Sequence, residues 1–233
     1  MRFTDFESRM SAARMRRYLI ACNGDSRKAM TLYRLNLALS LDLFAQISLF
    51  EVALRNAVDQ HLQIMLGYNW LINSTIPGGC FYGAQFKHTS ESICDAARKL
   101  GNTANHDQLV AALGFGFWRY LFAPHQFAAT GNSLLAVFHE RPASSAEQHY
   151  NARYIFNELA AVNRLRNRIA HHEPICFVPR KPLADTTYAR SNLLLIHNLL
   201  QWMGIPPGQL LFGVNHTAVI CSGIEKLVSQ QTI

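Results

Sequence analysis

The feature that most constrains how this chain can fold is a ladder of apolar residues between positions 35 and 65. Apolar side chains recur there at steps of three or four residues: Leu35, Leu39, Leu43, Ile47, Phe50, Leu54, Val58, Leu62 and Met65. This period places them on one face of an α-helix and predicts a long helix that lines a buried core. Gly67 and Pro77-Gly78-Gly79 then predict the end of the helix and a loop.

The remaining segments also carry helical rather than strand periodicity. Residues 84–100 are weakly amphipathic, and residues 107–122 predict a short helix that leads into an aromatic cluster and is ended by Pro124. A further helix is expected over residues 146–172, limited by Pro174, and others over residues 185–203 and 217–229. No segment alternates as a β-strand does. The sequence therefore predicts an all-α fold and a single domain over residues 1–233.

The weakly charged stretches of the chain favour buried helices over membrane spans. Residues 35–50 contain only one charged residue, Asp42, and are too short to cross a bilayer. The segment between Arg190 and Glu225 carries no charge but is interrupted by Pro206-Pro207. The start of the chain shows no apolar signal region, and the five cysteines form no CxxC pair, which fits a reduced compartment. We therefore expect a cytoplasmic protein without a membrane partner.

An excess of basic residues favours polyanionic partners. Lys and Arg number 22 against 15 Asp and Glu, which gives a formal net charge of +7 and a pI near 9.4. Two groups of basic residues stand out: Arg9, Arg14, Arg16, Arg17, Arg27 and Lys28 at the start, and Arg153, Arg164, Arg166 and Arg168 in a later predicted helix. Charge alone fits a nucleic-acid partner and equally an ordinary solvated surface.

The segment Arg166 to Pro174, RNRIAHHEP, contains the residue types that RNA cleavage without metal requires. Histidine titrates near neutrality, so it can take the proton of a ribose 2′-hydroxyl or protonate a leaving oxygen, while Arg166 neutralises phosphate charge. Asn167 and Arg168 add donors. On an ideal helix, Arg166 and His171 lie roughly 140° apart, so joint action needs a frayed helix end or a second copy of the helix. The alternative is a solvated basic face with histidines near the helix C-terminus.

The same segment does not favour a metal site or a cofactor. Glu173 is the one acidic residue in this segment, and a single carboxylate is a poor basis for a two-metal site. A zinc site formed by His171, His172 and Cys176 would lack a fourth ligand at a recognised spacing.

Three blocks of the chain together resemble one protein family. RNRIAHHEP resembles the defining pattern of the HEPN ribonucleases, an Arg and a polar residue followed by a His, here Arg166, Asn167 and His171, and its His-Glu-Pro tail is similar to that of Abi-like abortive-infection proteins. Residues 32–58 and 113–122 resemble further blocks of that family.

The resemblance implies a HEPN-like helical bundle with extra helices and long loops. It also implies a metal-independent endoribonuclease that acts in phage defence or as a toxin, with an RNA substrate and no cofactor. The resemblance further implies a homodimer in which the two Arg-His motifs meet in a shared cleft, and a partner in the form of a small antitoxin RNA, which holds some relatives of this kind inactive.

The resemblance suggests roles for individual residues. His171 would be the general acid or base, Arg166 would stabilise the transition state and Asn167 would orient. Either histidine could face the cleft, although the apolar stripe predicts that His172 turns inward. A non-catalytic RNA-binding or protein-interaction module is the alternative function.

Two further blocks have competing interpretations. Glu51, Arg55 and Asn56 lie in the block that resembles the family and could support the site with Arg168 and Glu173, whereas an ion pair between Glu51 and Arg55 within one helix is the simpler interpretation. The aromatic cluster lies at Phe115, Phe117, Trp118, Tyr120 and Phe122. Its residues could stack on RNA bases, but such clusters more often fill a core.

Overall fold

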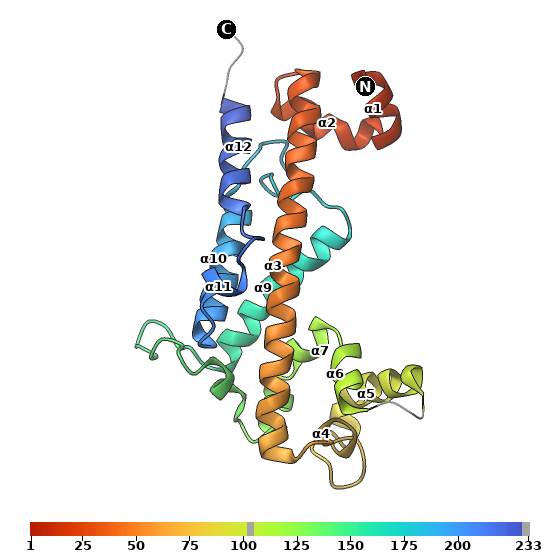
Figure 1. Cartoon of the computed structure of the whole chain (residues 1–233), viewed down its shortest axis with the longest axis vertical. Coiled ribbons are helices and arrows are strands. Elements are labelled where there is room, and N and C mark those ends of the chain that lie inside the picture. Colours follow the sequence, from red (N-terminus) through yellow and green to blue (C-terminus); the bar gives the residue numbers. More distant parts are fainter. Residues whose placement is uncertain (102–104, 230–233) are drawn as a thin grey trace. The chain divides into compact units, whose positions relative to one another are not determined.

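The computed structural model describes residues 1–101 and 105–229, and these are mostly helical (Figure 1). The α-helices are α1 (Phe3–Met10), α2 (Ala12–Ala21), α3 (Ser26–Leu66), α4 (Trp70–Asn73), α5 (Lys87–Leu100), α6 (His106–Ala112), α7 (Phe115–Tyr120), α8 (Pro124–Ala129), α9 (Ala152–Ala170), α10 (Thr187–Trp202), α11 (Pro207–Leu210) and α12 (Thr217–Ser229). The 3-10 helices η1 (Ala84–Phe86) and η2 (Leu134–Phe138) complete the set. Within the described residues, the β-type pairing is one isolated antiparallel bridge between Phe177 and Ala184. The predicted all-α class is therefore confirmed.

The chain divides into two compact units. Unit 1 comprises residues 1–48, 164–197 and 207–233, and unit 2 comprises residues 49–163 and 198–206. Helices α3, α9 and α10 each contribute residues to both units. The single domain expected over residues 1–233 stays a prediction.

Each unit has its own aromatic core. In unit 1 the buried Tyr18 ring packs edge-on against Tyr33 and Phe177, with ring centroids 5.2 and 5.1 Å away. In unit 2 the buried Trp70 and Trp118 rings meet with centroids 6.3 Å apart. Edge-to-face rings of this kind stabilise a core beyond the area they bury.

The long helix α3 confirms most of the predicted ladder. Its side chains from Leu39 to Leu62 in that series are at most 1% exposed, whereas Met65 at the end is 54% exposed. The helix begins at Ser26, earlier than the ladder indicates, because a carboxylate oxygen of Asp25 accepts the backbone N–H groups of Arg27 and Lys28 and caps it. It ends before Gly67, as predicted.

The length of α3 also bears on the question of a membrane. One 18-residue window of this 41-residue helix has a mean hydropathy of 1.7, so by length and composition it could cross a bilayer. A buried core helix meets the same criteria, and 39% of that window is buried inside the protein. The cytoplasmic localisation stays a prediction.

The boundaries of the other helices agree in part with the sequence. Helix α12 matches residues 217–229, and α5 and α10 lie within the predicted segments. The short helix expected within residues 107–122 corresponds to α6, and the aromatic cluster that follows it lies largely on a second helix, α7, because Leu113 and Gly114 take extended backbone angles and separate the two. Pro124 begins α8 at its first position, where its missing N–H is no loss, rather than merely ending a helix. Helices α1 and α2 were not predicted.

Candidate functional site

The RNRIAHHEP segment forms the C-terminal end of α9 and the turn that follows it. The N–H of His172 donates to the carbonyl of Ile169, and the N–H of Glu173 donates to the carbonyl of Arg168, both at 2.9 Å. This pair of bonds is the Schellman arrangement, which requires a left-handed residue just beyond the helix. His172 occupies that position with φ 55°. Both histidines therefore lie outside the helix, and each is exposed.

Two sequence features make the helix end here. Pro174 has no N–H and disfavours a helical conformation at Glu173. Beyond it, Ile175 and Cys176 are fully buried, which draws the chain back onto unit 1. The side-chain oxygen of the buried Asn36 on α3 accepts their N–H groups at 2.9 and 3.3 Å. Asn36 thus fixes the backbone just after the motif.

Arg168 anchors the same turn. Its Nε donates to Glu173 Oε2 at 3.1 Å, and its Nη2 donates to the carbonyl of Pro174 at 2.9 Å. Its guanidinium also lies over the Tyr188 ring, 4.5 Å from the centroid. These contacts hold the turn and occupy part of the donor set of Arg168. The role of Arg168 and Glu173 in supporting an RNA site stays a prediction.

Helix α2 contributes two arginines that lie beside this turn. The hydroxyl of Ser11 accepts the N–H of Arg14 at the start of this helix, and Met15 and Tyr18 bury its inner face. Arg14 Nη1 donates to the carbonyl of His172 at 3.0 Å. The guanidinium of Arg17 lies over the Phe177 ring, 5.0 Å from its centroid. Both arginines are therefore held beside the turn.

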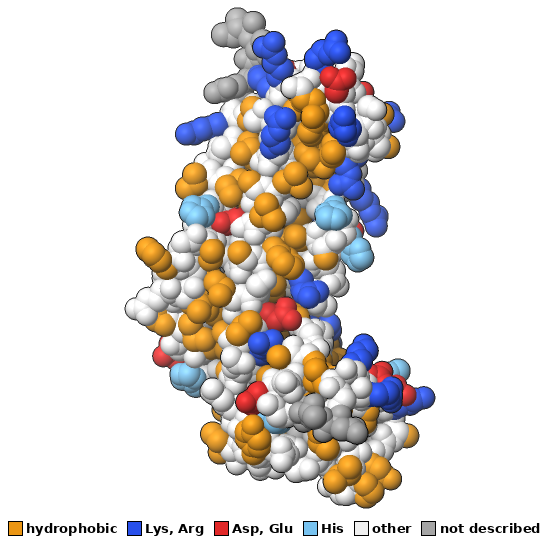
Figure 2. All heavy atoms as spheres, turned by 45° about the vertical axis from the view of Figure 1, so that its right-hand side comes forward, with side chains coloured by type: hydrophobic (Ala, Val, Ile, Leu, Met, Phe, Trp, Pro, Cys, Tyr) orange, Lys and Arg blue, Asp and Glu red, His pale blue; other side chains and the backbone are white. Residues whose placement is uncertain are grey.

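Two open pockets of unit 1 are lined by residues of α2 and of the turn. The first, which we call the histidine groove, has a volume of about 460 Å³ and is lined by Arg14, Arg17, His171, His172 and residues adjoining them on α2 and the turn. The second has a volume of about 390 Å³ and includes Arg17, Arg168 and Arg180. Arg17, Glu173 and Pro174 line both pockets. Figure 2 shows Lys and Arg side chains gathered over the part of unit 1 that carries the N-terminal helices.

The histidine groove is suited to an anion. Glu173 carries the one acidic side chain among its lining residues and is paired with Arg168. The guanidinium groups of Arg14 and Arg17 are thus not neutralised by a carboxylate within this lining. Guanidinium groups bind phosphate oxygens through parallel hydrogen bonds, and exposed imidazoles beside them can exchange protons.

The predicted site residues are only partly brought together. His171, His172 and Glu173 line the histidine groove, and Arg168 lines the neighbouring pocket. Arg166 is half-buried and Asn167 is exposed, and neither lines these two pockets. The expectation that His172 turns inward is wrong, because the helix stops at Ala170 and the apolar stripe does not continue through the turn.

Glu51, Arg55 and Asn56 belong to unit 2, on the later part of α3. Glu51 and Arg55 are half-buried and Asn56 is exposed. Arg55 Nε is buried without a hydrogen-bond acceptor. Their role in supporting the motif stays a prediction.

Metal binding finds no ligand set in the part of the chain that the structure describes. No group of three or more His, Cys, Asp or Glu side chains there could hold an ion. Cys176 is fully buried, and burial raises the pKa of its thiol to about 12. His171, His172 and Cys176 accordingly form no such group among the described residues.

Arg14, Arg17 and Asn36 are the site residues that sequence reasoning did not single out. The two arginines were visible as part of a basic cluster, and their spacing of three residues on a segment with buried Met15 and Tyr18 is a usable signal for one face of a helix. Asn36 lies inside the apolar ladder, where an amide side chain is a hint of a buried hydrogen bond.

Comparisons with protein-family models, with curated proteins and with solved structures find no match to this chain.

Proposed function

We propose that this protein is a metal-independent endoribonuclease of the Abi-like HEPN type, and that it cleaves RNA at the histidine groove. The observation that carries the proposal is the position of two exposed histidines, His171 and His172, beside Arg14 and Arg17 in one open groove. The formal charge of +7 and the sequence pattern of residues 166–174 support an RNA substrate.

The chemistry follows from these side-chain types. His171 removes the proton of the ribose 2′-hydroxyl, and the 2′-oxygen forms a bond to the adjacent phosphorus while the bond to the 5′-oxygen breaks. The leaving 5′-oxygen takes up a proton from an imidazolium or from water. The products are a 2′,3′-cyclic phosphate and a 5′-hydroxyl. Arg166 stabilises the charge on the phosphorane oxygens, and Asn167 orients the phosphate.

Arg14 and Arg17 extend this proposal to the N-terminal helices. Their role is to hold the RNA backbone against the turn, since their guanidinium groups are positioned by the His172 carbonyl and the Phe177 ring. Because these side chains are already held in place, less conformational entropy is lost when a phosphate binds.

A homodimer would bring Arg166 and His171 together in one active site. The two residues lie five positions apart, Arg166 on α9 and His171 just beyond its end, and Arg166 lines neither pocket of unit 1. A second copy of the motif facing the first would bring an Arg166 from each protomer to a shared cleft. We propose a cytoplasmic role in phage defence or as a toxin, with a small antitoxin RNA as a partner.

Cleavage of a labelled single-stranded RNA in the presence of EDTA tests the proposed reaction. We expect products that end in 2′,3′-cyclic phosphate, and a rate at least about 100-fold lower for Arg166→Ala and for whichever of His171→Gln and His172→Gln removes the acid–base group. Arg153→Gln and His125→Gln change exposed residues of unit 2 and serve as matched controls. If folded protein without bound inhibitor leaves diverse RNAs intact, the ribonuclease proposal is refuted.

Arg14→Gln and Arg17→Gln separate binding from chemistry. We expect both to weaken RNA binding and to reduce the dependence of binding on salt concentration, because each removes one phosphate contact. Saturable binding of RNA by the wild-type protein without any products would favour the alternative function, a non-catalytic RNA-binding module.

Sequencing of RNA that co-purifies with wild-type protein and with the His171→Gln variant tests the biological role. An enriched small RNA in both samples would support an antitoxin partner. An enriched set of intact transcripts in the variant alone would identify substrates.

A further inference from the structure

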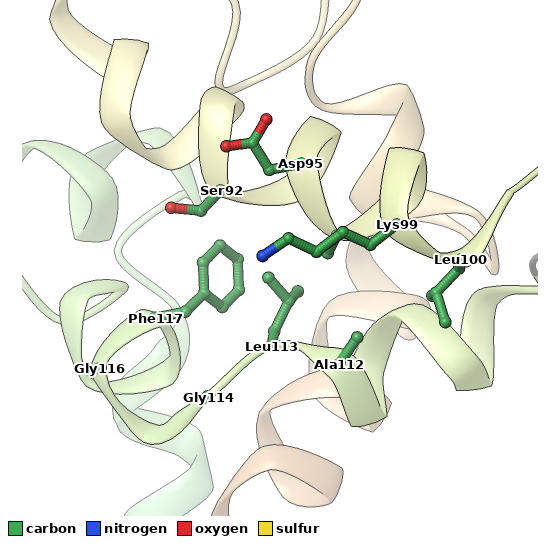
Figure 3. A pocket seen from close by; sticks show the side chains of 10 residues that line it. Ser92, Asp95, Lys99, Leu100, Ala112, Leu113, Gly114, Gly116 and Phe117 are labelled. Atoms are coloured by element: carbon green, nitrogen blue, oxygen red, sulfur yellow. The ribbon is translucent and has the colours of Figure 1, made fainter.

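A second pocket lies entirely within unit 2, between α5 and the chain that joins α6 to α7. It has a volume of about 470 Å³, within the range of small-ligand sites. Ser92, Asp95 and Lys99 of α5 lie on one helix face that lines it, since they are separated by three and four positions. Figure 3 shows the Lys99 ammonium directed toward the Phe117 ring, with Gly114 and Gly116 on the opposite wall.

Two glycines leave the wall opposite α5 without side chains (Figure 3). Gly114 is the N-cap residue of α7, with φ −78° and ψ 171°, and Gly116 lies in the first turn of that helix. A Cβ atom built on either residue would meet no atom within 4 Å, apart from its chain neighbours and, for Gly116, the backbone of its own helix. Because neither residue has a side chain, a ligand in the pocket can approach the backbone closely.

Phe117 forms a fixed aromatic wall of this pocket. It is half-buried, and its ring meets the buried Trp118 edge-on with centroids 5.2 Å apart. Trp118 is itself held by a hydrogen bond from its Nε1 to the carbonyl of Leu113 at 2.9 Å. Phe115, Trp118 and Phe122 are buried, as expected for core residues, whereas Phe117 and the 41%-exposed Tyr120 are not.

The charges of the pocket favour a ligand that is both flat and anionic. Lys99 is exposed, and its ammonium can bind a phosphate. Asp95, the one acidic side chain of the lining, is paired at 2.6 Å with Arg98, which does not line the pocket.

We propose that this pocket binds a nucleotide, with the base stacked on Phe117 over the glycine backbone and the phosphate at Lys99. The nucleotide is either a free mononucleotide or one residue of a single-stranded RNA. The site consists of unit 2 residues only and does not depend on the ribonuclease activity proposed for unit 1.

Calorimetric titration of the full chain tests the site. The probes are the nucleoside 5′-monophosphates, ribose 5-phosphate and a short 2′-O-methyl oligouridine, which has no free 2′-hydroxyl and therefore resists the proposed cleavage. We expect saturable binding of a mononucleotide, of the oligouridine or of both, which also distinguishes the two sources. Ribose 5-phosphate should bind more weakly than the mononucleotides, because it has no base to stack.

The variants are chosen to separate binding from folding. Phe117→Leu should weaken nucleotide binding by at least about fivefold, because it removes the stacking surface. Lys99→Gln should weaken it as well. Gly116→Ala should weaken binding by filling the pocket without lowering the melting temperature, because Ala is favoured over Gly in a helix. Gly114→Ala should also weaken binding but lower the melting temperature slightly, because Ala is a poorer N-cap residue than Gly.

Gly223→Ala on α12, Tyr120→Leu and Lys87→Gln are matched controls outside the pocket lining and should bind as the wild type does. The proposal is overturned if neither nucleotide probe binds at millimolar concentration. It is also overturned if ribose 5-phosphate binds as tightly as the mononucleotides, or if the pocket variants bind like the controls.

Discussion

Replacement of Asn36 by alanine should release the chain just after the histidine turn. The Asn36 side-chain oxygen accepts two buried N–H groups, those of Ile175 at 2.9 Å and Cys176 at 3.3 Å. A buried donor without an acceptor costs about 1–3 kcal/mol. The second bond is long, so we expect the free energy of unfolding to fall by about 2–4 kcal/mol in total. Asn36→Asp keeps an acceptor oxygen and should lose less.

Urea unfolding and amide hydrogen exchange together measure this effect. Asn56→Ala removes an exposed asparagine from the same helix and should change stability by less than about 0.5 kcal/mol. In Asn36→Ala, exchange should accelerate first at Ile175 and Cys176, because their protection depends on that amide. Wild-type exchange at both positions, or a stability loss no larger than that of Asn56→Ala, would refute the argument.

Three further predictions concern stability. His172→Gly should raise the free energy of unfolding by about 0.5–1 kcal/mol in urea titrations, since φ 55° is strained for histidine and free for glycine; a decrease would contradict this. Asp59→Ala should lower the free energy of unfolding by about 2–5 kcal/mol, because the buried carboxylate accepts a hydrogen bond from Trp70 Nε1 and bonds to His106 Nε2, both at 2.7 Å. A denaturation midpoint equal to that of the wild type would count against this. Hydrogen bonds from Thr187 lower the pKa of Asp185. The Thr186 hydroxyl, and then Arg190, lower the pKa of Glu225. The stability that these two carboxylates contribute is therefore present above their pKa values in the unfolded chain, and is lost as the pH falls through their pKa values in the folded protein. The urea midpoint should therefore drop on acidification below about pH 4, and less so in Asp185→Asn; an equal drop in the variant would exclude a contribution from Asp185.

Local patterns account for the parts of the fold that were predicted correctly. The ladder on α3 and the extent of α12 follow from apolar periodicity, which is a property of neighbouring residues. The break between α6 and α7 was missed because Gly114 in the loop and the buried Leu113 override an otherwise continuous pattern. Helices α1 and α2 were missed because their short segments are rich in charge and bury few residues, Phe6, Met15 and Tyr18.

By itself the sequence determined the helical class, the end of α9 near Pro174 and the presence of two adjacent histidines there. Only the tertiary structure decided which side chains accompany them. Arg14 reaches the carbonyl of His172 across 158 positions of the chain, and Asn36 reaches Ile175 across 139. Spacing along a sequence carries no information about such pairs, because they are fixed by how helices bury their apolar faces together. The same packing ended α9 two residues earlier than predicted and turned His172 outward.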